Sequence, residues 1–269
     1  MRIAIGLEYD GTAYNGWQRQ RTGIGVQSLV EDALSTVANE PIEVTCAGRT
    51  DTGVHASAQV CHFDTQSERE PHGWLLGANS NLPDDVGVTW ACPVDESFHA
   101  RFAATARSYH YLILNRLERS ALYRHRAWWV YNDLDAECMH RAAQALLGKH
   151  DFSAYRAAGC QASTAVREIT SITVTRDRDW IHLNVTANAF LQHMVRNIMG
   201  TLVTIGCGDE SEEWAAQALE SRDRKQAGAA APPHGLTLVG VAYPKEFNLP
   251  ADPNEKLWEP APAGDQSRI

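Results

Sequence analysis

The strongest constraint on the fold of this chain is an order of strand and helix patterns that occurs twice. In the first half, apolar and polar residues alternate strictly over 2–9, with Ile3, Ile5 and Leu7 on one face, as in a half-buried strand. Apolar residues then recur at helical spacing over 26–37. The rest of this half predicts strands over 42–46 and 58–63, a short helix over 74–82 and a strand over 86–94. The order is therefore strand, helix, strand, strand, helix, strand.

The second half repeats this order. It predicts strands over 108–115, 168–175, 180–187 and 236–243, and helices over 135–148, 189–206 and 211–223. We expect Gly148 to stop the first of these helices and Ser211 to cap the last. Two such units indicate an α+β fold of two ferredoxin-like, RRM-like domains, each an antiparallel sheet with helices on one face. The two sheets are expected to join side by side, with a cleft between the domains.

No low-complexity linker separates the two halves, so we expect them to pack firmly. The predicted division is an N-terminal α+β domain over 1–105, which carries the candidate catalytic loop, and a C-terminal α+β domain over 106–245. Residues 246–269 contain several prolines and are expected to form an extended or loose tail.

The six cysteines form no C-x-x-C pair and no metal-ligand spacing, which indicates reduced thiols and a cytoplasmic protein. The N-terminus has acidic residues where a signal peptide needs an apolar run. No apolar stretch approaches the ~20 residues that span a bilayer. We therefore expect neither export nor a membrane partner.

The charge distribution matters more than the net charge of −9, which by itself argues against a nucleic-acid partner. Six arginines lie between 101 and 126, where Glu118 is the only acidic residue. A polyanion responds to the local surface, and the planar guanidinium suits phosphates and bases. The arginine excess over lysine, 20 to 4, is equally explained by a genome rich in G and C.

The stretch CAGRTDTGVHASAQV at 46–60 places Arg49 and Asp51 between Gly48 and Gly53. Such glycines allow a sharp turn or a close approach to another molecule. An ordinary surface turn has the same residues, since Asp and Thr beside Gly bond their own backbone. Other parts of the chain must decide between these interpretations.

A second candidate segment is NAFLQHMVRNIMG at 188–200, in which Arg196 stands among apolar residues. A long helix can direct such an arginine to its surface. A buried arginine would need a carboxylate partner, and Asp51 is the unassigned one. His193 is more simply explained as an ordinary helix residue, because no second His or Cys stands at metal-ligand spacing. We expect no metal site.

Aromatic and basic residues alternate in SFHARFAATARSYHY at 97–111. Such a mixture suits RNA, whose bases stack on rings and whose phosphates meet guanidinium groups. Tyr109 and Tyr111 share one strand face, so each is also consistent with a core residue.

Asp51-Thr52-Gly53 also spells the aspartic-protease triplet. That mechanism needs two such carboxylates, whereas the chain has one copy, and an adjacent arginine would stabilise the charged form that the dyad must partly avoid. A dimeric protease is therefore rejected, although it remains the nearest enzymatic rival.

Four motifs together, LEYDGTAYNGWQRQ, CAGRTDTGVHASAQV, FHARFAATARSYHY and NAFLQHMVRNIMG, resemble the bacterial tRNA pseudouridine synthase A family. The resemblance covers about 2–244, and the motif G-R-T-D-x-G-V-H-A is long and specific. It implies isomerisation of uridine to pseudouridine at positions 38, 39 and 40 of the tRNA anticodon arm, by a homodimer that needs no cofactor.

The resemblance also implies a role for single residues. Asp51 is the nucleophile, Arg49 displaces the target base, Tyr109 contacts that base, and Arg196 pairs with the catalytic carboxylate. The segments 98–102 and 159–163 resemble stretches that contact RNA, and the candidate contact residues in them are Phe98, His99, Arg101, Phe102 and Gln161. Tyr109 is also a candidate relay for the proton that leaves C5. A non-catalytic RNA-binding protein is the alternative, although it leaves a lone aspartate in a glycine-bounded loop unexplained.

Overall fold

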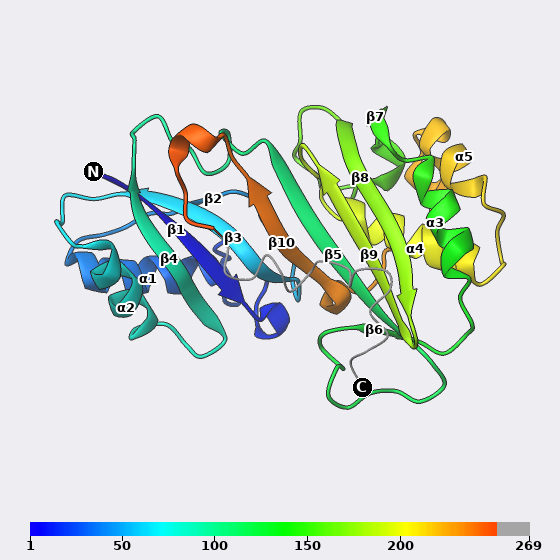
Figure 1. Ribbon diagram of the computed structural model, residues 1–269, viewed down its shortest axis with the longest axis horizontal. Coiled ribbons are helices and arrows are strands. Elements are labelled where there is room, and N and C mark those ends of the chain that lie inside the picture. The colour runs from blue at the N-terminus through cyan, green and yellow to red at the C-terminus, as the bar shows by residue number, and fades with distance from the viewer. Residues whose placement is uncertain (252–269) are drawn as a thin grey trace, which may run out of the picture.

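In the computed structural model of the protein, which describes residues 1–251, ten strands form one continuous sheet (Figure 1). Its main path runs β4-β1-β3-β10-β5-β9-β8-β7, with β2 beside β3 and β6 beside β5. The strands are β1 (Arg2–Tyr9), β2 (Thr45–Cys46), β3 (His55–Asp64), β4 (Val86–Val94), β5 (Ala106–Asn115), β6 (Trp128–Val130), β7 (Gly148–Asp151), β8 (Val166–Asp177), β9 (Trp180–Ala187) and β10 (Leu236–Ala242).

Each half of the sheet has the ferredoxin-like order. In the first half the neighbours run β4-β1-β3-β2, and in the second they run β10-β5-β9-β8, with antiparallel pairing along both of these paths; β6 adds to β5 in parallel. The halves meet where β10 pairs in parallel with β3, at Thr237 opposite His55 and Leu238 opposite Ala56. The predicted α+β class is confirmed.

The helices gather in two groups at opposite ends of the sheet (Figure 1). The helix α1 (Val26–Ala38) packs on α2 (Pro71–Asn79), and α3 (Ala136–Gln144) packs on α4 (Met194–Gly206) and α5 (Trp214–Ser221). Apolar residues at helical spacing make the buried face of α1, namely Val26, Val30, Ala33 and Leu34. The central strands β3, β10 and β5 lie between the two groups.

Several predicted boundaries in the second half are wrong. The helix predicted over 189–206 begins only at Met194, because His193 adopts a left-handed conformation with φ of 61°. Gly148 does not stop a helix: α3 ends at Gln144, and Gly148, with φ of 92°, opens strand β7. Ser211 does not cap α5, whose first turn follows Glu213 without a side-chain cap.

A smaller apolar cluster lies apart from the main core. Phe98 is fully buried there, and its ring lies 5.1 Å from those of Tyr243 and Phe247. Of the expected tail, residues 246–251 are described, and Phe247 and Leu249 pack on this cluster. Residues 252–269 lie outside the described part of the chain. None of the helices within 1–251 has the length and apolar character that a bilayer span requires.

Candidate active site

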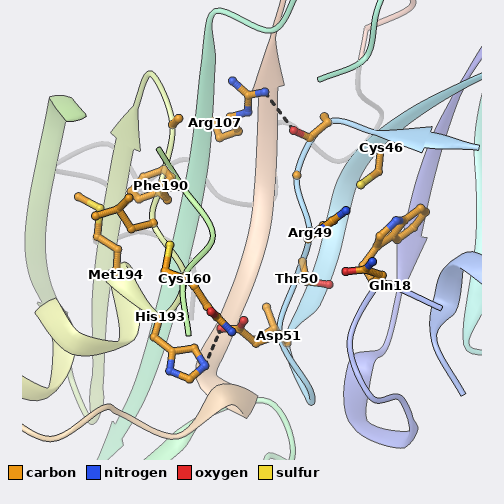
Figure 2. Close-up of a pocket in the computed structure, with 18 of the residues that line it drawn as sticks. Gln18, Cys46, Arg49, Thr50, Asp51, Arg107, Cys160, Phe190, His193 and Met194 are labelled. Atoms are coloured by element: carbon orange, nitrogen blue, oxygen red, sulfur yellow. Dashed lines mark hydrogen bonds and ion pairs between the residues drawn. The ribbon is translucent and has the colours of Figure 1, made fainter. Parts of the chain in front are cut away.

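A pocket of about 1000 Å³ lies between the two halves, with both contributing to its lining (Figure 2). The first half contributes Trp17 and the segment 44–52, and the second contributes Tyr109, residues 159–162 and residues 189–196. The expected cleft between the halves therefore contains the loop that carries Asp51.

The Asp51 loop is fixed from behind by Thr50. Its carbonyl accepts a hydrogen bond from the Trp17 amide at 3.0 Å, and its buried hydroxyl lies 2.8 Å from the Tyr9 hydroxyl. The neighbours of Thr50, Arg49 and Asp51, both line the pocket. The two charged residues thus line the pocket on either side of a threonine whose hydroxyl is bonded in the core.

The two glycines of the loop differ. Gly53 has φ of 77°, a conformation that favours glycine, and a tight turn follows from Val54 N–H donating to Asp51 C=O at 3.1 Å. Gly48 has no positive φ, and an added Cβ there would meet no atom within 4 Å. The backbone conformation therefore requires glycine at position 53 but not at position 48.

Asp51 has two basic neighbours. One of its carboxylate oxygens, Oδ2, lies 3.6 Å from Nε2 of His193 and 3.7 Å from Nη1 of Arg196. Figure 2 shows the imidazole of His193 turned toward Asp51. Arg196 is held independently, since its Nε donates to the Ala231 carbonyl at 2.7 Å. Both contacts to Asp51 exceed the length of a direct hydrogen bond.

Tyr109 lies beside Asp51 in the pocket wall and is 8 % exposed. Burial raises the pKa of its phenol, and the charge of Asp51 raises it further. Its ring meets the edge of the Phe190 ring at 5.1 Å. Tyr109 therefore presents a neutral hydroxyl near the carboxylate, which can donate a hydrogen bond or pass on a proton.

The other expected contact residues are divided between pocket and core. Arg101, Phe102, His99 and Gln161 line the pocket, and Phe102 is 77 % exposed, with its ring 4.3 Å from that of His99. Phe98 is buried away from the pocket, so we assign it to the core and not to a ligand surface.

Arg49 is exposed in the pocket. Within residues 1–251 its guanidinium makes no hydrogen bond and no ion pair. Its donors are therefore available to a ligand.

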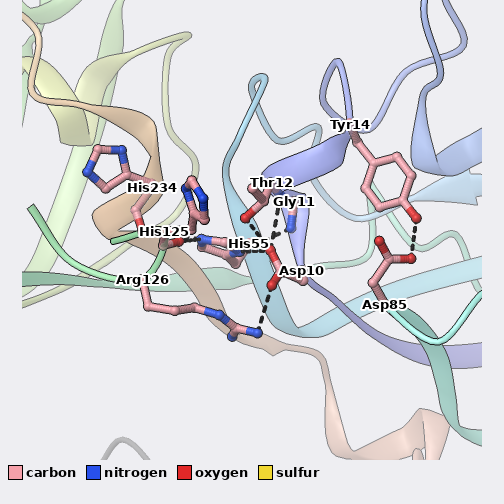
Figure 3. Close-up of polar contacts among 9 residues, drawn as sticks. All are labelled: Asp10, Gly11, Thr12, Tyr14, His55, Asp85, His125, Arg126 and His234. Atoms are coloured by element: carbon pink, nitrogen blue, oxygen red, sulfur yellow. Dashed lines mark hydrogen bonds and ion pairs between the residues drawn. The ribbon is translucent and has the colours of Figure 1, made fainter. Parts of the chain in front are cut away.

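A cluster of polar groups supports the far end of the Asp51 loop, where the two halves join (Figure 3). Burial lowers the pKa of His55, whose Nε2 lies 2.8 Å from the His125 carbonyl and whose Nδ1 accepts from Gly11 N–H at 3.0 Å. Asp10 lies 3.1 Å from the same Nδ1 and bonds Arg126 at 2.9 Å. The cluster thus ties the loop to both halves.

His193 and Arg107 are two site residues that the sequence did not reveal. The apolar periodicity of 189–206 assigned His193 to a helix, and a left-handed backbone at a histidine leaves no local signal. Arg107 also lines the pocket, and the sequence shows it only as one of the six arginines between 101 and 126. In the part of the chain described, no group of three His, Cys, Asp or Glu side chains suits a metal ion.

Comparison with known proteins identifies the family. A family model described as tRNA pseudouridine synthase matches residues 6–103, which include Asp51, and residues 142–244, which include Arg196. The chain belongs to the tRNA pseudouridine synthase family. It is therefore an isomerase that acts on tRNA.

Curated relatives agree over nearly the whole chain. The tRNA pseudouridine synthase A of Shewanella amazonensis is 54 % identical over 93 % of this chain and 96 % of its own length. That of Pseudoalteromonas atlantica is 55 % identical over 93 % and 95 %, and that of Coxiella burnetii strain Dugway 5J108-111 is 53 % identical over 94 % and 97 %.

Proposed function

We propose that this chain converts uridine to pseudouridine at positions 38, 39 and 40 of the tRNA anticodon arm, with Asp51 as the nucleophile. The observation that carries the proposal is the position of the Asp51 carboxylate, which lines a pocket between the halves with Arg196 and His193 within 4 Å. The positions in tRNA rest on the resemblance to the family.

The reaction breaks the N1–C1′ bond, turns the uracil and joins C5 to C1′. No redox change occurs and no group leaves the molecule, so the proposal includes neither a cofactor nor a metal. An ionised carboxylate can attack C1′ or C6, or assist departure of the base through a glycal. The guanidinium of Arg196 lies 3.7 Å from this carboxylate and is opposite to it in charge.

The target base must leave its stack to reach this carboxylate, at a cost of a few kcal/mol. Arg49 is suited to take its place, because its guanidinium has no protein partner among the described residues and projects from the same loop as Asp51. Tyr109 then lies against the displaced uracil. In this proposal Arg49 displaces the target base, and Asp51 of the same loop acts as the nucleophile.

The rim of the pocket suits the rest of the RNA. Arg101 lies 5.8 Å from the centre of the Phe102 ring, and this exposed pair offers a charge for phosphate and a ring for stacking. His99 and Gln161 extend the same rim. We further propose that the enzyme acts in the cytoplasm as a homodimer, with one tRNA crossing both subunits.

The two rivals fit the site less well. A protease dyad needs a second carboxylate beside Asp51, whereas the charged side chains within 4 Å of it among the described residues are those of His193 and Arg196. A non-catalytic RNA-binding protein needs no nucleophile, and the isomerase family argues against it.

The test is release of tritium from C5-labelled uridine in tRNA transcripts, by the wild type and by Asp51→Asn, with mapping of the pseudouridines formed. Release by the wild type and none by a variant that still binds tRNA would support Asp51 as nucleophile. Full release by Asp51→Asn would refute that role, and pseudouridine outside positions 38–40 would refute the assigned positions.

A further inference from the structure

Arg107 is a buried cation for which the proposed chemistry has no use. It lies near the start of β5 and is 9 % exposed. Burial lowers the pKa of its guanidinium, although an arginine remains charged at neutral pH. Among the ion pairs of residues 1–251 none involves Arg107. A buried charge without a carboxylate must be stabilised in another way.

Four backbone carbonyls provide that stabilisation. Nη1 donates to Ala104 at 3.1 Å and to Asn188 at 2.9 Å. Nη2 donates to Ala47 at 3.0 Å and to Arg101 at 2.6 Å. Figure 2 shows Arg107 reaching toward the strand end that leads from Cys46 to Arg49.

The four carbonyls belong to three of the segments that line the pocket or lead into its lining. Ala47 stands directly before the segment of Arg49 and Asp51. Arg101 and Ala104 belong to the loop that carries Phe102, and Asn188 begins the segment that leads to His193 and Arg196. One planar side chain thus connects the backbone of all three segments by hydrogen bonds.

The contacts at the reacting carboxylate are too long to do this themselves. Asp51 lies 3.6 Å from His193 and 3.7 Å from Arg196, whereas the bonds of Arg107 span 2.6–3.1 Å. Hydrogen bonds of the latter length are directional and short enough to fix a separation. Arg107 therefore joins Ala47, which precedes the Asp51 loop, to Asn188, which precedes His193, by direct hydrogen bonds.

We propose that Arg107 is a positioning residue, which sets the distance between the Asp51 loop and the segment of His193 and Arg196 through its two-nitrogen fork. The inference rests on the proposed role of Asp51. It predicts that turnover depends on the hydrogen-bonding geometry of the guanidinium at position 107, and that a positive charge at this position does not by itself maintain turnover. Lysine keeps the charge but presents a single nitrogen, which cannot span four carbonyls in a plane.

The test compares Arg107→Lys with the wild type in single-turnover tritium release at saturating tRNA. We expect the rate to fall about 100-fold, the effect of displacing a reacting group by about 1 Å. The tRNA dissociation constant should change less than about threefold, because the exposed arginines remain. Amide hydrogen exchange should become faster over 47–53 and 188–193 but not in α1.

Arg176→Lys is the control for an arginine hydrogen-bond network outside the pocket, at an exposed position. Arg176 also donates to several acceptors, among them the Leu134 carbonyl and the Asn115 side chain, both at 2.6 Å, and it does not line the pocket. It should lose stability with a turnover rate near that of the wild type. An equal loss of rate in both variants would overturn the proposal, because the rate would then follow general stability.

Two other results would also overturn it. The first is an Arg107→Lys enzyme that turns over within threefold of the wild type. The second is failure of both Arg107→Lys and Arg107→Gln to fold, as judged by circular dichroism, since Arg107 would then be needed for the stability of the whole fold.

If only the lysine variant fails to fold, the glutamine variant, whose side-chain amide has two N–H donors and no charge, is assayed in its place with the same expectation. Asp51→Asn, run in parallel, separates the two proposals: activity there would refute the nucleophile and not the role of Arg107 in holding the segments.

Discussion

Substitution of Gly16 by alanine should damage the active site from outside the pocket. Gly16 has φ of 87°, and an added Cβ would lie 2.6 Å from the Thr50 carbonyl oxygen, in the loop of Asp51. The left-handed conformation costs an alanine roughly 1–2 kcal/mol, and overpacking adds roughly 1–3 kcal/mol. Relief of the clash to an ordinary contact of 3.4 Å requires the loop to move by 0.8 Å (3.4 − 2.6).

Two other glycines separate these effects. Gly208 also has a positive φ, 78°, but an added Cβ there would meet nothing within 4 Å. Gly208→Ala should therefore lose only the backbone cost of about 1–2 kcal/mol. Gly48→Ala should leave the free energy of unfolding unchanged or raise it by about 0.4–1 kcal/mol, since its φ is not positive and its surroundings are open.

The assays are thermal unfolding and single-turnover tritium release at a temperature where all variants are folded. At roughly 2–4 °C per kcal/mol, Gly16→Ala should lower Tm by about 10 °C and Gly208→Ala by about 4 °C. The displaced loop should slow turnover by Gly16→Ala about 10- to 100-fold, whereas Gly208→Ala should keep the wild-type rate. If Gly16→Ala resembled Gly208→Ala in both measurements, the support of the Asp51 loop by Gly16 would be refuted.

Three further predictions concern single side chains. Phe98→Ala should lower the free energy of unfolding by about 3–5 kcal/mol, because its ring is buried. Phe102→Ala should change the free energy of unfolding by less than about 0.5 kcal/mol, because its ring is exposed, but it should weaken tRNA binding in filter assays by about 1–3 kcal/mol. Arg196→Met should slow turnover about 100-fold, because it removes the cation that lies 3.7 Å from the proposed nucleophile. Burial lowers the pKa of His62 to about 4, so Tm should fall as the pH decreases from about 6.5 to 4, and less so in His62→Gln.

Each of these predictions has a result that contradicts it. Equal losses of stability in Phe98→Ala and Phe102→Ala would contradict the assignment of Phe98 to the core. Wild-type turnover by Arg196→Met would show that Asp51 does not depend on that cation. For His62 the sign follows from its lowered pKa: below about pH 6.5 the unfolded chain binds a proton at this histidine and the native chain does not, so acid favours unfolding. Identical pH profiles of Tm for the wild type and His62→Gln would refute this prediction.

The parts of the fold that depend on local pattern were predictable from the sequence. The strands over 86–94 and 180–187 have the bounds predicted from the sequence. The strands β6 and β7 were not predicted, because three or four residues are too few to show an alternation of apolar and polar side chains. Their conformation depends on pairing with β5 and β8. Tertiary pairing decides such segments.

The site was predictable where a residue's chemistry was unusual for its surroundings. Asp51 between glycines and Arg196 among apolar residues both stood out, and the structure brings them to 3.7 Å. His193 did not, because the conformation that turns it toward Asp51 is a single backbone angle. Phe98 and Phe102 are chemically identical, and only packing distinguishes the buried ring from the exposed one.

The position of β10 has a consequence for the order in which the enzyme becomes active during its synthesis. This strand is translated after the segments that carry Asp51, Tyr109 and Arg196, yet it pairs with β3 and joins the halves, and Leu236 lines the pocket. Ala231, just before it, holds the side chain of Arg196. During synthesis the loop of Asp51 is therefore complete before the pocket around it can form, so assembly of the site depends on the pairing of β10 with β3.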